Sequence, residues 1–182
     1  MGKNIAVIYG TKHGTTKRYA EWIAEELSAA LFARNEIRPD ELQNYDCVVF
    51  GGGLYASAII GADLVAKNPC KNLVLFTVGL GDPQTSDYSE HMSKNFPPSA
   101  TQPLKVFHLR GGIDYSQLNL VHRGMMAMMK KMTVDKKKPE ERTTDDQLLV
   151  DTYGGKIDFT DRETIMPIVE YVRGLTNTEE NP

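Results

Sequence analysis

Short apolar segments alternate along the chain with segments of helical periodicity, and this alternation limits the possible folds more than any other feature of the sequence. Strands buried on both faces of a sheet read as continuous apolar runs. Four such runs are Ile5–Tyr9, Cys47–Phe50, Leu73–Val78 and Val106–Leu109. A more polar run at Phe32–Ile37 suits an edge strand, because Pro39 prevents its continuation. Since such alternation is typical of right-handed crossovers, the sequence predicts an α/β fold with a five-stranded parallel sheet covered on both faces.

Three segments carry apolar residues at helical spacing. The first spans Tyr19–Leu31 and the last spans Thr164–Leu175. Between them runs an apolar stripe that we interpret as core packing rather than a membrane or quinone contact; it comprises Leu118, Val121, Met125, Met128, Met129 and Met132. A polar insertion is predicted at about residues 133–157, because Asp135–Arg142 is too rich in charge to be core. A length of 182 residues suits one domain, so residues 1–182 are predicted to form a single domain.

Charge, hydropathy and cysteine content exclude several classes of function. Lys and Arg number 21 against 24 Asp and Glu, and the net charge of −3 predicts no nucleic-acid partner. No apolar run approaches the ~20 residues of a membrane span, so we expect no transmembrane segment and do not favour peripheral membrane contact. The early polar residues and the absence of a CxxC pair predict a cytoplasmic protein, with Cys47 and Cys70 as thiols. The 4 histidines lack metal-ligand spacing, so no metal site is expected.

The segment between the first strand and the first helix carries a candidate phosphate site. A phosphate held there would meet backbone N–H groups and the positive end of the helix dipole, and threonine hydroxyls can donate further hydrogen bonds. The candidate residues are Thr11, Lys12, His13, Gly14, Thr15 and Thr16. The spacing matches neither GxGxxG nor a loop ending in GK[ST], which argues against dinucleotide and ATP binding. The alternative is that these threonines only cap the helix.

Glycine-rich segments follow the next two strands of the predicted sheet. After Phe50 the candidates are Gly52, Gly53, Leu54, Tyr55, Ala56 and Ser57, and after Thr77 they are Val78, Gly79, Leu80, Gly81 and Asp82. Glycines let backbone approach a flat ligand, and they permit φ > 0, so that a peptide can flip. Tyr55 can stack on a ring or simply cover the core. Ligands of open α/β sheets bind outside the carboxyl ends of the strands, so the three loops are expected to converge on one site.

The sequence resembles the flavodoxin family, in which a loop of the form T-x-T-G-x-T binds the phosphate of FMN. Here His13 stands in place of the middle hydroxyl. Within that family, Val106–Tyr115 is similar to the strand-Gly-x-Leu-Asp-Tyr segment of the branch of menaquinone-dependent protoporphyrinogen IX dehydrogenase, and a Met-rich helix follows in both. The resemblance implies a three-layer flavodoxin-like sandwich with strand order 2-1-3-4-5. It also implies FMN as a noncovalent redox cofactor, with no side chain needed as a catalytic acid or base.

Three functions are compatible with this resemblance. The first is electron transfer to a redox partner protein, and the second is an FMN-dependent oxidoreductase of the protoporphyrinogen or quinone type, acting on a small molecule or quinone acceptor. The third is a non-catalytic binding module. That branch carries an Arg-Tyr pair after the third strand and a basic residue after the fourth, where this sequence has Tyr55-Ala56 and Gly79–Asp82. Groups for porphyrin propionates are therefore missing, and slow oxidation of protoporphyrinogen is expected.

Overall fold

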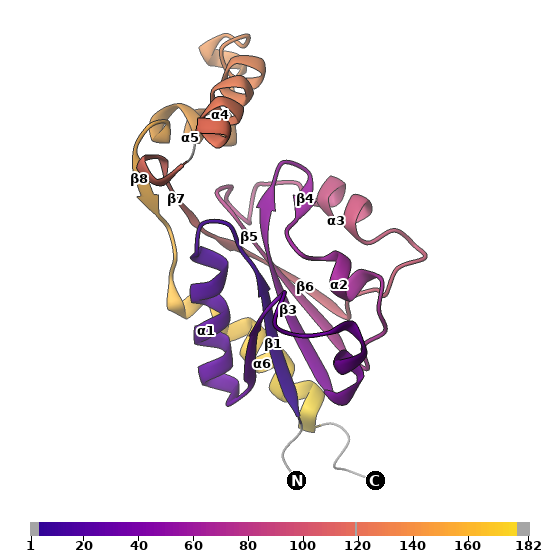
Figure 1. Cartoon of the computed structure of the whole chain (residues 1–182). Helices are drawn as coiled ribbons and strands as arrows, with labels where there is room; N and C mark the ends of the chain where they lie inside the picture. Colours follow the sequence, from indigo (N-terminus) through magenta and orange to yellow (C-terminus); the bar gives the residue numbers. More distant parts are fainter. Residues whose placement is uncertain (1–3, 119, 178–182) are drawn as a thin grey trace.

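The computed structural model describes residues 4–118 and 120–177 of the chain. Its main sheet has parallel strands in the order β2-β1-β3-β5-β6 (Figure 1). These strands are β1 (Ile5–Gly10), β2 (Ala30–Ala33), β3 (Cys47–Tyr55), β5 (Leu73–Gly79) and β6 (Lys105–Arg110). A short strand, β4 (Ala58–Ile59), pairs antiparallel with the end of β3. Counting the parallel strands alone, the predicted α/β fold and its strand order 2-1-3-4-5 are confirmed.

Helices cover both faces of this sheet. On one face lie α1 (Thr15–Leu27) and α6 (Met166–Asn177), and on the other lie α2 (Asp63–Ala66), α3 (Ser89–Asn95) and the 3-10 helix η1 (Pro39–Asn44) (Figure 1). Successive residues of a strand point to opposite faces. Val49 therefore packs in the cluster of Tyr19, whereas Phe50 packs in the cluster of Leu64. The two layers of core explain why the strands read as continuous apolar runs.

The boundaries of the first helix and of the edge strand differ from the prediction. α1 ends at Leu27, four residues before Leu31, because Ser28 adopts a left-handed backbone conformation with φ of 50°. The chain reverses there, and the edge strand is Ala30–Ala33 rather than Phe32–Ile37. Apolar spacing did not reveal this break, since Ser28 has no special propensity for the conformation that ends the helix.

The glycine run after Phe50 lies inside β3 rather than in a loop. The strand continues to Tyr55, and the turn comes at residues 56–57, between β3 and β4. A Cβ atom at Gly51 would overlap the ring of Phe76 on the neighbouring strand, so this glycine makes room for an aromatic side chain. Within the described chain the left-handed conformation at the turn belongs to Ala56, with φ of 51°, and not to Gly51, Gly52 or Gly53.

A second substructure leaves the sheet after β6, and we call residues 112–158 the arm. It begins with β7 (Gly112–Asp114) and returns through β8 (Lys156–Asp158), which pair antiparallel. Between these strands lie η2 (Tyr115–Gln117), α4 (Leu120–Thr133), η3 (Pro139–Glu141) and α5 (Thr144–Thr152). The arm projects from the sheet edge at which the parallel strands end (Figure 1). The insertion predicted at residues 133–157 lies within it, and the chain then passes through η4 (Arg162–Ile165) into α6.

The apolar stripe of α4 is exposed, so its interpretation as core packing was wrong. Leu118, which precedes the helix, is buried, but Val121 is 69% exposed and Met128 is 58% exposed. Met125 and Met132 are exposed as well, and the side chain of Met129 lies outside the described residues. Periodicity identified an apolar helix face correctly, but the fold leaves that face without a packed layer above it.

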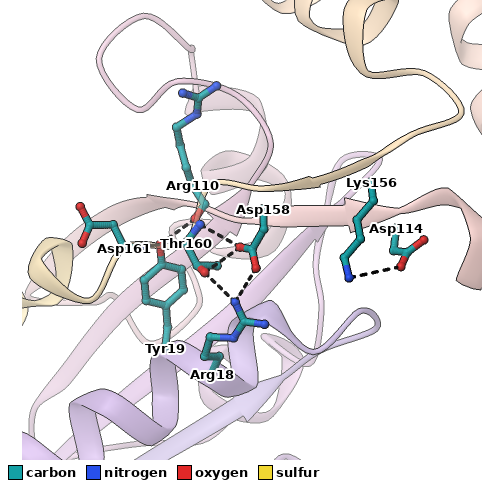
Figure 2. Close-up of polar contacts among 8 residues, drawn as sticks. All are labelled: Arg18, Tyr19, Arg110, Asp114, Lys156, Asp158, Thr160 and Asp161. Atoms are coloured by element: carbon teal, nitrogen blue, oxygen red, sulfur yellow. Dashed lines mark hydrogen bonds and ion pairs between the residues drawn. The ribbon is translucent and has the colours of Figure 1, made fainter.

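Tyr19 joins both ends of the arm to the body of the protein. Its hydroxyl donates a 2.7 Å hydrogen bond to the backbone carbonyl of Arg110, where the chain enters the arm. The same oxygen accepts a 3.1 Å bond from the N–H of Asp161, where the chain leaves it (Figure 2). Tyr19 of α1 thereby holds together the two chain segments that connect the arm to the body.

Arg18 makes the second attachment of the arm. Its Nη1 donates 2.7 Å bonds to Asp158 Oδ2 and to Thr160 Oγ1 (Figure 2). The bond from Arg18 to Asp158, followed by the bond from the Thr160 hydroxyl, lowers the pKa of Asp158 to about 2. Both charged side chains remain more than a third exposed, so the ion pair is expected to contribute only ~0.5 kcal/mol to stability.

Within residues 4–118 and 120–177, no helix has the length and apolar content that a membrane span requires. The two cysteines lie on opposite faces of the sheet, Cys47 in the cluster under α1 and Cys70 against the cluster under α2. Both are free thiols, and burial raises the pKa of Cys70 to about 11.

Candidate functional site

A cavity of about 560 Å³ opens at the carboxyl ends of β1, β3 and β5. Its walls come from the three loops that the sequence singled out and from α4 of the arm. The volume lies within the ~300–1,000 Å³ range of typical ligand pockets. The convergence follows from the parallel sheet, because all three strands end at the same edge.

The loop between β1 and α1 forms the first wall. Gly14 is the N-cap residue of α1 with φ of 85°, and its N–H donates a 3.0 Å bond to Thr11 Oγ1. No side chain caps the helix at Gly14, so the threonines do not act as N-caps here. Thr15 and Thr16 are the first helical residues, at the positive end of the helix dipole.

Two glycines allow neighbouring backbone to approach these threonines. A Cβ atom on Gly53 of β3 would lie 3.1 Å from Thr16 Oγ1, and one on Gly111 would lie 3.1 Å from Thr15 Oγ1. Both distances are tighter than ordinary side-chain contacts. Larger residues at these glycines would push against the hydroxyls that line the cavity.

Tyr55, at the end of β3, joins this loop to α4. The Nζ atom of Lys12 lies 3.5 Å from the centre of the Tyr55 ring. The hydroxyl of Tyr55 donates a 3.0 Å bond to the sulfur of Met125, and its ring meets that of His122 edge-on at 5.4 Å. The tyrosine therefore bridges the body and the arm instead of covering the core.

The opposite wall is built around Tyr88 and His91. Tyr88 stacks on His108 with ring centres 3.7 Å apart, and His108 Nδ1 lies 2.6 Å from Thr77 Oγ1. Partial burial, followed by the charge of nearby His91, lowers the pKa of His108. His91 Nε2 lies 2.8 Å from the carbonyl oxygen of Ala56, and this contact supports the left-handed turn between β3 and β4.

Most of the site residues predicted from the sequence line the cavity. They are Thr11, Lys12, His13, Thr15, Thr16, Gly53, Leu54, Tyr55, Ala56, Val78, Gly79, Leu80 and Gly81. Gly14 shapes the loop without lining the space. The structure places the remaining three elsewhere: Gly52 packs against Ile59, Ser57 bonds to Glu90 of α3, and Asp82 accepts the N–H of Gln84 in a local turn.

Several cavity residues were not anticipated by sequence reasoning. Tyr88 and His91 follow a polar loop without periodicity, so nothing in their spacing marked them. His122 lies beside the Met125 and Met128 wall of α4, and a histidine next to an apolar stripe was the signal that could have identified it. Within residues 4–118 and 120–177, no cluster of three potential metal ligands is found.

Comparison with known proteins defines the class to which this fold and cavity belong. Residues 6–140 match the model of the flavodoxin domain family. The chain therefore belongs to the flavodoxin domain family. The match ends within the arm, before α5, β8 and α6.

Individual relatives are more distant. An uncharacterized protein of Methanocaldococcus jannaschii is 32% identical over 72 residues, which cover 37% of this chain and 48% of that protein. The chain thus matches about half the length of this curated relative.

Solved flavoproteins show partial similarity to the chain. A flavoprotein from Lactobacillus acidophilus in complex with FMN is 15% identical, with a TM-score of 0.44 over 58% of this chain and 93% of that chain. A WrbA-like flavodoxin from Agrobacterium tumefaciens is 26% identical, with a TM-score of 0.38 over 45% and 63%. Oxidised flavodoxin 2 from Bacillus cereus is 15% identical, with a TM-score of 0.43 over 59% and 84%.

Proposed function

We propose that this protein binds FMN noncovalently in the cavity and transfers electrons through it. The observation that carries the proposal is the convergence of a hydroxyl-rich helix start, a glycine-containing strand end and an aromatic side chain on one cavity. Membership of the flavodoxin domain family supports it. A bound flavin would supply one- and two-electron chemistry, and the protein would bind, orient and shield it.

The residues around the cavity fit the parts of such a cofactor. Thr15 and Thr16 present hydroxyls at the start of α1, where a phosphate gains from the helix dipole. Tyr55 and Tyr88 both line the cavity, where an aromatic side chain can stack on a flat ring. Gly79 and the residues after it would bring backbone to the ring edge.

With the thiols reduced and no span found, we also propose a cytoplasmic location.

Calorimetric titration of the protein with FMN and with riboflavin tests this function. We expect stoichiometric FMN binding and much weaker riboflavin binding, since riboflavin lacks the phosphate. Thr16→Ala should weaken FMN binding by ~1.5–3 kcal/mol through loss of a charge-assisted hydrogen bond. Thr101→Ala, which alters a threonine bonded to Asn68 at the other end of the sheet, is the matched control and should bind FMN normally.

Two results would count against the proposal. Equal affinities for FMN and riboflavin would remove the phosphate site, and absence of binding to either would favour the non-catalytic binding module. A variant Thr16→Ala that melts at a lower temperature but binds FMN fully would assign Thr16 to packing alone.

A second candidate, an oxidoreductase acting on a small molecule or quinone, is favoured by one observation. The cavity extends along α4, where the side chains of Met125, Met128 and Met132 form an apolar wall beyond the loops. A screen of quinone, porphyrinogen and protein acceptors with the reduced holoprotein distinguishes this candidate from a carrier between redox partner proteins. Rapid reduction of one small acceptor with saturation would select the enzyme.

Protoporphyrinogen is expected to be a poor substrate of that enzyme, despite the resemblance to the protoporphyrinogen dehydrogenase branch. Arg110 does not line the cavity. Its Nε donates to the Leu80 carbonyl at 3.4 Å, and its guanidinium lies over Phe159. Unpaired carboxylates are costly to bury. Fast, quinone-dependent formation of protoporphyrin would contradict this expectation and support the branch assignment.

A further inference from the structure

A polar pair of side chains joins two neighbouring strands close to the cavity. Thr77 lies in the apolar strand β5 and is 1% exposed. Its Oγ1 atom is 2.6 Å from Nδ1 of His108, its register partner on β6. A buried hydroxyl needs such a partner. Whichever of the two atoms donates, the bond fixes the rotation of the imidazole ring.

The pair points to the face of the sheet that α2 and α3 cover. Leu75 and Val106 precede Thr77 and His108 by two residues on their strands, and both pack in the cluster of Leu64 of α2. Since successive side chains of a strand alternate between faces, Thr77 and His108 point the same way as these two residues. The imidazole is therefore held by the sheet itself.

Tyr88 stacks on this imidazole. The two ring centres are 3.7 Å apart, and the planes of the rings are inclined by only 7°. Among the residues that the structure describes, Tyr88 lines the cavity and His108 does not. A row of contacts thus runs from β5 through β6 to an aromatic side chain of the cavity wall.

This support matters because Tyr88 belongs to an irregular segment. Residues 80–88, between β5 and α3, form neither helix nor strand. A side chain that is ordered only when a ligand binds costs ~0.5–1.5 kcal/mol of the binding free energy. Stacking on His108 restricts the Tyr88 ring before any ligand arrives, so the binding of a ligand against that ring avoids this cost.

The other tyrosine of the cavity has a different support. Lys12 Nζ lies 3.5 Å from the centre of the Tyr55 ring, and the Tyr55 hydroxyl bonds to the sulfur of Met125 in the arm. Both partners come from outside the sheet. Side chains that are held by strands are placed more precisely than side chains held by loops. Tyr88 is therefore the better placed of the two to orient a flat ligand.

The imidazole is also suited to stacking. Partial burial, followed by the charge of His91, lowers the pKa of His108, so its ring is neutral near pH 7. Replacing both partners of a buried polar pair with apolar groups can leave stability nearly unchanged. Thr77 and His108 thus matter more for the placement of Tyr88 than for the stability of the sheet.

We propose that His108 is a positioning residue for the cofactor: fixed by Thr77, it holds the Tyr88 ring in the orientation in which this tyrosine stacks on the flavin ring. The proposal rests on the proposed function, namely that FMN binds in the cavity. His108 acts through Tyr88 and does not contact the cofactor. Loss of His108 therefore weakens binding of the flavin ring and leaves binding of the phosphate unchanged.

Titration with FMN and with riboflavin tests this role. His108→Ala should weaken both ligands by the same factor, ~3–10-fold, because both carry the ring and one side chain must then be ordered on binding. Thr16→Ala should instead weaken FMN more than riboflavin. The matched control is Phe107→Ala, which removes a ring contact between β6 and Tyr171 of α6 on the other face of the sheet. It should bind both ligands as the wild type does.

The fluorescence of bound FMN gives a readout that a loss of stability does not change. A stacked tyrosine quenches flavin emission by donating an electron to the excited ring, so FMN bound to the wild-type protein should be strongly quenched. His108→Ala should restore part of the emission of the bound flavin. Phe107→Ala should leave it quenched.

A combination with Tyr88→Leu tests the route of the effect. Tyr88→Leu should weaken FMN at least as much as His108→Ala does. Adding His108→Ala to Tyr88→Leu should cause no further loss, because the histidine acts only through the tyrosine. In a Tyr55→Leu background, by contrast, His108→Ala should keep its full effect.

The outcomes separate this role from the function on which it rests. Unchanged affinity and emission in His108→Ala, or a full further loss in the Tyr88→Leu background, would overturn the role and leave FMN binding intact. Unquenched FMN on the wild-type protein would overturn it as well. Absence of FMN binding by folded wild-type protein would overturn both. If His108→Ala folds poorly, His108→Leu, which fills more of the space without a flat ring, provides the same test.

Discussion

The body of the protein and its arm use apolar residues in opposite ways. Leu75, in the central strand β5, has no exposed surface, whereas Leu120, at the start of α4, is 85% exposed. In the body, helices on both faces of the sheet bury all the apolar side chains of β5 from Leu73 to Val78. Among the described side chains of the arm, the buried apolar residues are Ile113, Tyr115, Leu118 and Val134. The comparison shows that apolar content predicts burial only where a second layer is available to provide it.

The largest expected effect comes from the same substitution made in the two regions. Leu75→Ala should reduce the free energy of unfolding by ~2–5 kcal/mol, because it opens a cavity in the core. Leu120→Ala should change it by less than ~0.5 kcal/mol, since the side chain is in solvent. Urea unfolding followed by circular dichroism measures both. A large loss for Leu120→Ala would mean that α4 is packed in solution, and the comparison would fail.

Removing the arm tests whether the body depends on it. Gly112 and Asp158 are register partners, so a short Gly-Ser linker can join them in place of residues 113–157. The body should keep one cooperative unfolding transition, with a free energy of unfolding within ~1 kcal/mol of the full chain, because the shorter connection offsets lost contacts. A broad or absent transition would show that the arm completes the core.

The attachment of the arm should weaken in acid. The pKa of Asp158 is lowered to about 2 by Arg18 and Thr160, so its contribution is fully present above the pKa of an unfolded aspartate, ~3.9, and is lost as pH falls toward 2. Limited digestion with pepsin between pH 4 and pH 2 should first cut residues 112–158. Asp158→Asn should shift the onset of cutting to higher pH, while Asp151→Asn, in α5, should not. Simultaneous cutting of body and arm at every pH would contradict a separate release.

The smallest effect is expected on the surface of the body itself. Lys17 and Glu21 are one turn apart on α1, with Nζ of the lysine 3.7 Å from Oε1 of the glutamate. Both side chains are about half exposed. Lys17→Ala should cost only ~0.3 kcal/mol, measured by the same urea unfolding. A cost similar to that of Leu75→Ala would show that location in the body, rather than burial, determines the loss.

Sequence reasoning predicted the body better than the arm for a physical reason. The strand at Leu73–Val78 is evident in the sequence, because burial on both faces leaves Thr77 as its one polar residue. The end of α1 at Ser28 was missed, since a left-handed residue other than glycine carries no composition signal. Likewise, the spacing of apolar residues showed the apolar face of α4 in the sequence. Whether that face is buried depends on the elements that the tertiary structure places against it.

The sequence predicted the part of the candidate site that lies at the ends of the strands. The hydroxyls of Thr15 and Thr16, which follow β1, and the ring of Tyr55, at the end of β3, were predicted from their places near strand ends. His91 and His122 were missed, because they come from α3 and from the arm, and no local sequence pattern specifies where these elements lie. Their contacts with Ala56 and Lys12 are long-range in the chain and appear only once the tertiary structure is known.

The two bonds made by the Tyr19 hydroxyl bear on the speed of folding. α6 packs Ile168 and Val172 against the cluster that contains Tyr19, yet residues 111–165 separate it from β6. Closing a connection of this length costs ~2 kcal/mol more entropy than closing one of ~5 residues, which slows the search for the last helix. If β7 and β8 pair first, the unpaired chain between β6 and α6 shrinks to residue 111 and residues 159–165, which run past the Tyr19 hydroxyl. We therefore expect hairpin closure in the arm to precede docking of α6, and deletion of the arm to accelerate refolding.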